Sequence, residues 1–141
     1  MTGAYVPSPR FFFLILFLLP VAPPGSASAH HSFAAEYDAT KPVALHGTVR
    51  QVDWVNPHAW IHLDVKGADG DTVSWMVELG TPNVLVRRGF TKRSLEPGTA
   101  IVVQGYLAKN GENKVNGGTV TFTDGTKLFV GGSSPNELPQ K

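Results

Sequence analysis

The sequence predicts an all-β fold, a small OB-like Greek-key barrel with one short helix between the third and fourth strands. Closely spaced runs of β-branched and apolar residues are separated by turn signals such as Asn56-Pro57-His58. One helix signal, Thr81-Pro82, stands between the third and fourth runs. A plain antiparallel roll with one helix is the structural alternative.

Three strands are expected before the helix: Val43 to Val55, Ala59 to Val65 and a run from Val73 to Leu79. Side chains alternate along a strand, so Trp60 and His62 face away from the side that Ile61 and Leu63 share. The first two strands form a hairpin. If that hairpin pairs residue 53 with residue 60, Gln51 lies opposite His62.

The helix and the later strands follow from local signals. Thr81 can cap the helix, Pro82 suits its first position, and Gly89 ends it. The remaining expected elements are a turn over Thr91 to Leu95, a strand from Ile101 with a bend or bulge at Gly105, a strand from Val115 to Phe122, a turn at Asp124-Gly125 and a short return from Lys127 to Val130.

The first 29 residues read as a secretory signal peptide. Arg10 precedes the apolar run from Phe11 to Leu19, and Ala27-Ser28-Ala29 matches a cleavage site. A run of roughly nine apolar residues is short for a membrane span, so an uncleaved anchor is the less favoured alternative. The expected organisation is a signal peptide over 1–29 cleaved after Ala29, an irregular arm over 30–41 pinned by Phe33 and Tyr37, an OB-like β domain over 42–131 and a disordered tail over 132–141.

Composition indicates the compartment and excludes one class of partner. The chain has no cysteine, which the periplasm permits. Without Arg10, 11 Lys and Arg balance 11 Asp and Glu, so export and neutrality argue against nucleic acid. No basic amphipathic helix or permanent membrane anchor is expected. The basic cluster Arg87, Arg88, Lys92 and Arg93 reads as a solvated face, with an anionic partner as the open alternative.

Cleavage after Ala29 would create a candidate metal site. The new terminal amine and the imidazole of His30 could chelate Cu(II), with His31 as the next ligand. The alternative is that both histidines are solvated residues at the start of a flexible arm.

The candidate ligand-binding residues lie on the face of the second and third strands and in the loop before it. They are Asn56, His58, Trp60, His62 and Glu78. His58 and His62 are roughly 13 Å apart along an extended chain, too far to share one ion, although Asp53 or Glu78 could join either. Three of these residues also have a structural explanation that involves no ligand. His58 could form a hydrogen bond within its own loop, His62 could be a half-exposed strand residue, and Trp60 could pack under the N-terminal arm.

An ordered set of motifs resembles a known family. The motifs are His30-His31-Ser32-Phe33, Gly47-Thr48-Val49, Trp54-Val55-Asn56-Pro57-His58-Ala59-Trp60, Glu78-Leu79-Gly80, Arg88-Gly89, Leu95-x-Pro97-Gly98 and Lys127-Leu128-Phe129. Together they resemble the small exported bacterial proteins of domain of unknown function 6152. The resemblance implies a periplasmic β-rich domain and supplies no activity or catalytic residues.

No enzyme signature is present: the chain lacks a cysteine nucleophile, G-x-S-x-G and H-E-x-x-H. We therefore expect a non-catalytic periplasmic binding module for a small molecule, a glycan or an envelope protein. The alternatives are a periplasmic copper protein anchored on His30 and a purely structural envelope protein.

Overall fold

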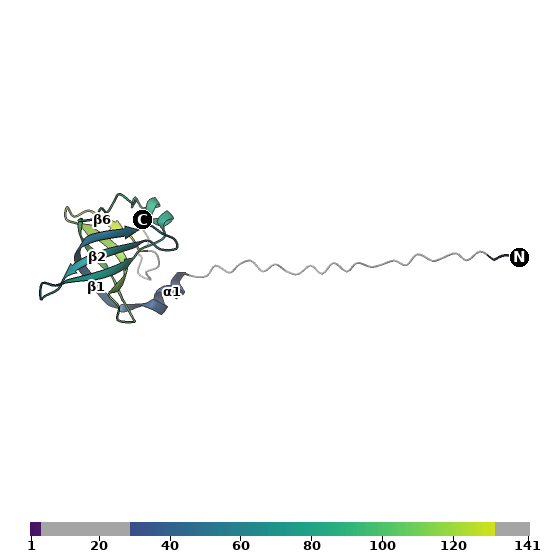
Figure 1. Cartoon of the computed structure of the whole chain (residues 1–141), viewed down its shortest axis with the longest axis horizontal. Helices are drawn as coiled ribbons and strands as arrows, with labels where there is room; N and C mark the ends of the chain where they lie inside the picture. The colour runs from purple at the N-terminus through teal and green to yellow at the C-terminus, as the bar shows by residue number, and fades with distance from the viewer. Residues whose placement is uncertain (4–28, 132–141) are drawn as a thin grey trace.

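The computed structural model describes residues 1–3 and 29–131, and within them the protein is a six-stranded sheet with two short helices (Figure 1). The expected all-β class is confirmed. The elements are α1 (Ala29–Glu36), β1 (Tyr37–Asp53), β2 (Trp60–Lys66), β3 (Thr72–Glu78), α2 (Pro82–Arg87), β4 (Ala100–Ala108), β5 (Lys114–Phe122) and β6 (Lys127–Phe129). The tail over 132–141 and nearly all of the predicted signal peptide lie outside the described residues.

The local signals around α2 and β4 predict the structure well. Thr81 caps α2, its hydroxyl accepting a hydrogen bond from the Val84 amide at 3.3 Å, and Pro82 is the first helical residue. Gly89, at φ +83°, follows the helix in a conformation that suits glycine. The β4–β5 register shifts between Gln104 and Gly105, where an irregularity was expected.

The prediction of an irregular arm over 30–41 was wrong. Residues up to Glu36 form α1, and β1 begins at Tyr37 rather than Val43. Two interactions stabilise this segment: Tyr37 pairs with Ala108 of β4, and Phe33 packs its ring edge against Tyr106 at 5.7 Å. Phe33 and Tyr37 are buried, in agreement with the prediction that they hold the segment against the domain.

The strands pair in a closed circuit. The sheet order is β3-β2-β1-β4-β5-β6, and β3 also pairs with β5 in parallel, so the pairings run β1-β2-β3-β5-β4-β1. The other five pairings are antiparallel. Gly117 permits the β3–β5 approach, because a Cβ there would lie 2.7 Å from Cγ1 of Val77.

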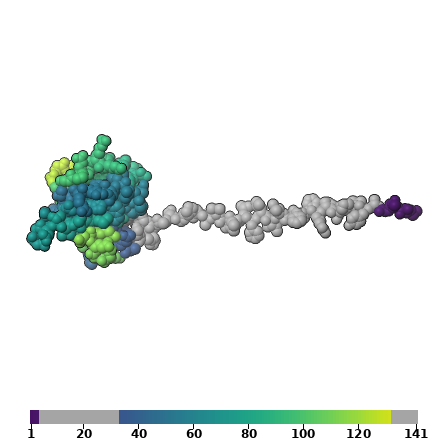
Figure 2. Space-filling model, in the orientation of Figure 1, coloured from purple at the N-terminus to yellow at the C-terminus, as the bar shows by residue number. Residues whose placement is uncertain are grey.

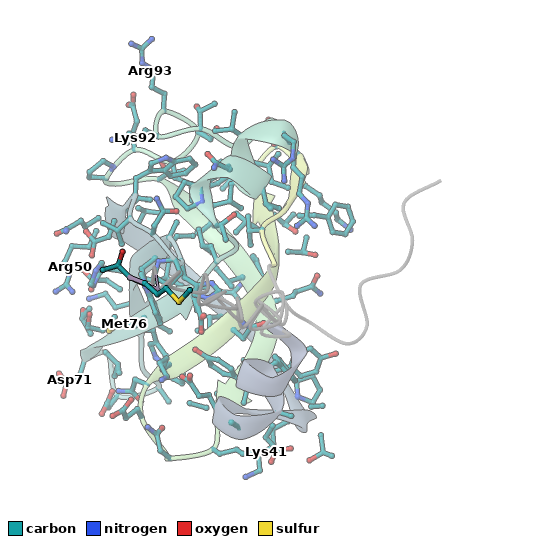
Figure 3. The ribbon with its side chains drawn as sticks, turned by 90° about the vertical axis from the view of Figure 1, so that its right-hand side faces the viewer. Lys41, Arg50, Asp71, Met76, Lys92 and Arg93 are labelled. Atoms are coloured by element: carbon teal, nitrogen blue, oxygen red, sulfur yellow. The ribbon has the colours of Figure 1, made fainter. Side chains whose placement is uncertain are left out.

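The strands enclose one main core. Its fully buried members include Val49, Ile61, Leu63, Val77, Leu85, Phe90, Val103, Val115 and Val120. Trp54 and Trp75 pack against this core, as predicted, whereas Trp60 belongs to neither of the two buried clusters. The helices α1 and α2 lie at opposite ends of the sheet (Figures 1 and 3). Among the described residues, no helix is long and apolar enough to cross a membrane.

Candidate functional site

The candidate ligand face is the outer surface of β2 and β3. Ile61 and Leu63 are fully buried in the core, while Trp60 and His62, which alternate with them, are half-buried on the other side. The hairpin pairs Asp53 with Trp60 and Gln51 with His62, which is the register considered from the sequence. On the other side of β2, Trp60 pairs with Glu78 and His62 with Met76.

His62 is hydrogen-bonded to Asp53. Its Nε2 lies 2.7 Å from Oδ2 of Asp53, and its Nδ1 lies 3.5 Å from a guanidinium nitrogen of Arg50. Because a carboxylate only accepts and a guanidinium only donates, neutral His62 carries its proton on Nε2. This hydrogen bond, together with one from the Gln51 amide, holds the pKa of Asp53 below its usual range.

His58 forms a second pair with Glu78. Its Nδ1 lies 3.0 Å from the carbonyl oxygen of Leu79 and 3.3 Å from Oε1 of Glu78. Both partners accept, so Nδ1 carries a proton and donates to them. In neutral His58 the other nitrogen, Nε2, is then an acceptor, and it has no hydrogen-bond partner within residues 29–131 as described.

Glu78 is also bonded to the start of β1. The hydroxyl of Tyr37 donates to Oε2 of Glu78, so the two carboxylate oxygens have different partners. Burial, followed by the neighbouring Glu78, raises the pKa of Tyr37 above its ordinary range. The ammonium of Lys114 lies 5.5 Å from the centre of the Tyr37 ring and 3.2 Å from Oε2 of Glu36. From the sequence, Tyr37 was expected only to pack the N-terminal segment against the domain, and Lys114 was not among the predicted site residues.

One row of cross-strand partners extends the face beyond β3. Asp53, Trp60, Glu78, Asn116 and Tyr106 are successive partners across β1, β2, β3, β5 and β4. Asn116 is only 3% exposed, and its Oδ1 has no partner among the described residues. Sequence reasoning missed Asn116 because its place depends on the parallel β3–β5 pairing, for which no local signal exists.

Two loops flank the face. Asn56 is exposed in the β1–β2 loop, and its peptide bond to Pro57 is cis. The β4–β5 loop joins from the other side, because the carbonyl of Asn113 accepts a hydrogen bond from the Met76 amide at 2.9 Å. Figure 2 shows this loop beside the end of α1, where Lys109 donates to the carbonyl of Ala34 at 2.5 Å.

The structure describes only the backbone of the two histidines of the predicted copper site. His30 and His31 are in α1, but their side chains are outside the described residues, so the chelate stays a prediction. Among the described side chains, no group of three or more His, Cys, Asp or Glu is placed to hold a metal ion. Each histidine–carboxylate pair offers two ligands. The face instead presents the Trp60 indole, the carboxylates of Asp53 and Glu78, and the amides of Asn56 and Asn116. It also presents Nε2 of His58, which can accept a hydrogen bond from a ligand.

Comparison with known proteins gives a family and no closer relative. No curated protein matches the chain, and no solved structure matches it. The model of one family, described only as of unknown function, matches residues 19–118, which include most of the sheet and all five candidate ligand residues. The chain therefore belongs to the family of unknown function DUF6152.

Proposed function

We propose that this protein is an exported, non-catalytic glycan-binding module, with its binding site on the outer face of β2 and β3. The residues we assign to that site are Asn56, His58, Trp60, His62 and Glu78. The proposal includes an OB-like Greek-key barrel and a periplasmic location after cleavage behind Ala29.

The order of strand pairing supports the barrel. A circuit β1-β2-β3-β5-β4-β1, with a helix between the third and fourth strands, is the order of a five-stranded OB-fold. OB-folds bind ligands on the face of strands two and three, between the β1–β2 and β4–β5 loops. The candidate residues lie on that face and in the first of those loops.

The observation that carries the binding proposal is the setting of Trp60. It lies outside both buried clusters, and its cross-strand neighbours are Asp53 and Glu78. Each of these carboxylates is bonded to a histidine, so it is held in place before a ligand arrives. A half-buried indole between fixed hydrogen-bonding groups is a typical arrangement for a ligand with one apolar and one polar face.

The charges on the face favour a sugar over a nucleic acid. OB-folds are known for both oligonucleotides and oligosaccharides. Asp53, Asp64 and Glu78 place carboxylates on this surface, which repel phosphates and accept hydrogen bonds from hydroxyls. The near-neutral composition of the chain agrees with that choice.

Titration with defined oligosaccharides tests the proposal. The probes are N-acetylglucosamine oligomers and glucose oligomers, followed by calorimetry and by tryptophan fluorescence. We expect one class to bind, and Trp60→Ala to weaken its affinity by on the order of tenfold through the lost ring contact. His62→Ala is expected to weaken binding less, because it removes a smaller contact surface than Trp60→Ala does and frees the Asp53 carboxylate.

Phe129→Ala is the matched control, since Phe129 is an exposed aromatic residue on β6. Urea unfolding of each variant verifies that the fold is retained. Loss of affinity in Phe129→Ala equal to that in Trp60→Ala would contradict the assigned face, and failure of every sugar to bind the wild type would contradict the ligand class. Mass spectrometry of the exported protein is expected to give His30 as its first residue, and another start would contradict the proposed cleavage.

A further inference from the structure

A second surface lies at the end of the molecule away from α1. We call it the basic tip and define it as Trp54, Val55, Val86, Arg87, Lys92 and Arg93. Figure 3 shows Lys92 and Arg93 projecting from this end, with Lys41 at the opposite end. Val55 and Val86 are 50% and 53% exposed, which makes them two of the few large apolar side chains open to solvent among the described residues.

An apolar cleft separates the loop after β1 from the segment after α2. It has a volume of about 430 Å³ and is lined by Trp54, Val86, Thr91, Lys92 and Arg93. The Trp54 ring stacks on buried Phe90 at 5.8 Å, which fixes one wall. Lys92 and Arg93 line the cleft as well, and both are exposed at this end of the molecule, as long charged side chains with apolar stems can be.

The backbone that carries the two cations is itself held in a turn. The Thr91 amide donates to the Ser94 hydroxyl at 2.8 Å, and the Ser94 amide donates to the Thr91 carbonyl at 3.0 Å. Lys92 and Arg93 stand between these bonds and are exposed. The basic tip is therefore preorganised in shape, although it is made of a loop, a short helix and a turn.

Within residues 29–131, the three cations of the basic tip have no carboxylate partner. Residues 82–95, which carry Arg87, Lys92 and Arg93, contain no carboxylate. Arg88 donates to the Gly131 carbonyl, whereas Arg87, Lys92 and Arg93 form no ion pair with any residue of the described ranges. An anionic partner would complement this surface.

We propose that the basic tip is a peripheral docking surface for an anionic phospholipid bilayer. Three features favour a bilayer over an acidic peptide. The first is that Lys92 and Arg93 project outward from an end of the molecule. The second is that the exposed side chains of Val55 and Val86 lie on the same surface. The third is that the Trp54 indole lines the cleft beside the cations. Apolar and indole groups enter the interfacial layer while Lys and Arg remain at the headgroups.

Vesicle flotation with the full chain tests this inference. The probes are vesicles of phosphatidylcholine alone and vesicles with about one third phosphatidylglycerol. We expect binding to the anionic vesicles only, and release as salt is raised. Each of Lys92→Ala and Arg93→Ala is expected to lower the partition coefficient by about fivefold, and Val86→Ser by a smaller factor.

Lys41→Ala is the matched control, because it removes one exposed cation from the opposite end of the molecule. All samples are produced identically, so the segment before residue 29 contributes equally to each. Equal binding to neutral vesicles, equal loss in Lys41→Ala, or no binding to anionic vesicles would each overturn the proposal. So would a dimer in solution that Arg93→Ala dissociates, since a second copy would then be the partner of this surface.

Discussion

The two histidine–carboxylate pairs on the face of β2 and β3 have the same chemistry and different surroundings. Glu78 has a side chain that is 12% exposed, and it accepts from His58 with one oxygen and from Tyr37 with the other. Asp53 is 35% exposed, and it is bonded to His62 and Gln51 from its own hairpin. Glu78 joins the β1–β2 loop and the distant start of β1 through His58 and Tyr37, whereas the Asp53–His62 pair is contained within one hairpin.

This difference divides the face into two halves. The half around Glu78 continues into the buried cluster of Phe33, Tyr37 and Ala108 with Tyr106, which α1 covers. The half around His62 is open and includes Met76, which is 41% exposed. We infer that the half around Glu78 contributes more to stability than the half around His62, while His58 and Glu78 remain part of the proposed ligand site. The predictions below test this division through the free energy of unfolding.

The largest expected effect is at Phe33. Its ring is 4% exposed and contacts both Tyr37 and Tyr106, so Phe33→Ala should lower the free energy of unfolding by about 3 kcal/mol. Met76→Ala on the open half should change it by less than about 0.5 kcal/mol. Urea unfolding followed by circular dichroism measures both. Similar values for the two variants would remove the distinction between the halves.

The next effect compares the two carboxylates directly. Glu78→Ala leaves the buried Tyr37 hydroxyl without its acceptor, and we expect a loss of about 2 kcal/mol. Asp53→Ala removes a more exposed partner of His62, and we expect about 0.5 kcal/mol. The same unfolding experiment applies. A loss at Asp53 as large as that at Glu78 would show that the hairpin pair is also structural.

The hairpin half could be predicted from the sequence and the covered half could not. A turn at Asn56-Pro57-His58 between two alternating runs indicates a hairpin, and the pairing of residue 53 with residue 60 was one register considered for it. The structure has that register and places Asp53 beside His62. These are contacts between residues close in the chain. The Tyr37–Glu78 hydrogen bond joins residues 41 positions apart. It depends on the pairing of β1 with β4 and on the pairing of β3 with β5, which are contacts between segments distant in the chain.

The helix α1 was missed for a related reason. Its sequence, AHHSFAAE, has no acidic residue in its first turn and no basic residue in its last, so no local signal marks its ends. Burial of Phe33 against Tyr106 stabilises it, and Tyr106 is 73 residues further along the chain. The same limit applies to the basic tip, because its three cations, Arg87, Lys92 and Arg93, could be found in the sequence but the cleft beside Trp54 and Val86 could not.

A third prediction uses the buried tyrosine. Its pKa is raised in the folded state, so above the unfolded value near 10 only the unfolded chain loses the proton, and stability falls as pH rises. The slope attributable to Tyr37 is about 1.4 kcal/mol per pH unit above about pH 10. At neutral pH Tyr37→Phe should cost about 1 kcal/mol for the lost hydrogen bond.

The decisive quantity is the difference between wild type and Tyr37→Phe, measured by urea unfolding between about pH 8 and pH 11. We expect the difference to shrink above about pH 10, because only the wild type carries the extra slope. Tyr106→Phe is a control for general effects of alkaline pH and tyrosine loss. A constant difference across the range would show that Tyr37 titrates alike in both states and that α1 does not shield it.

The smallest effect is expected at Asp53, and it tests whether the open half contributes to stability at all. The pKa of Asp53 is lowered by His62 first and by Gln51 second, so its carboxylate stabilises the fold above the unfolded value near 3.9. That contribution is lost as pH falls through the lower, folded value. Because Asp53 is 35% exposed, Asp53→Asn should cost only about 0.5 kcal/mol at neutral pH, and the gap should close below about pH 4. Asp64→Asn, on the same face of β2, removes a carboxylate that makes no hydrogen bond with the described residues and should lower the free energy of unfolding at neutral pH by less than Asp53→Asn does. If the two variants behave alike, the His62–Asp53 contact adds nothing to folding, and any advantage of holding that carboxylate in place must come from a bound ligand.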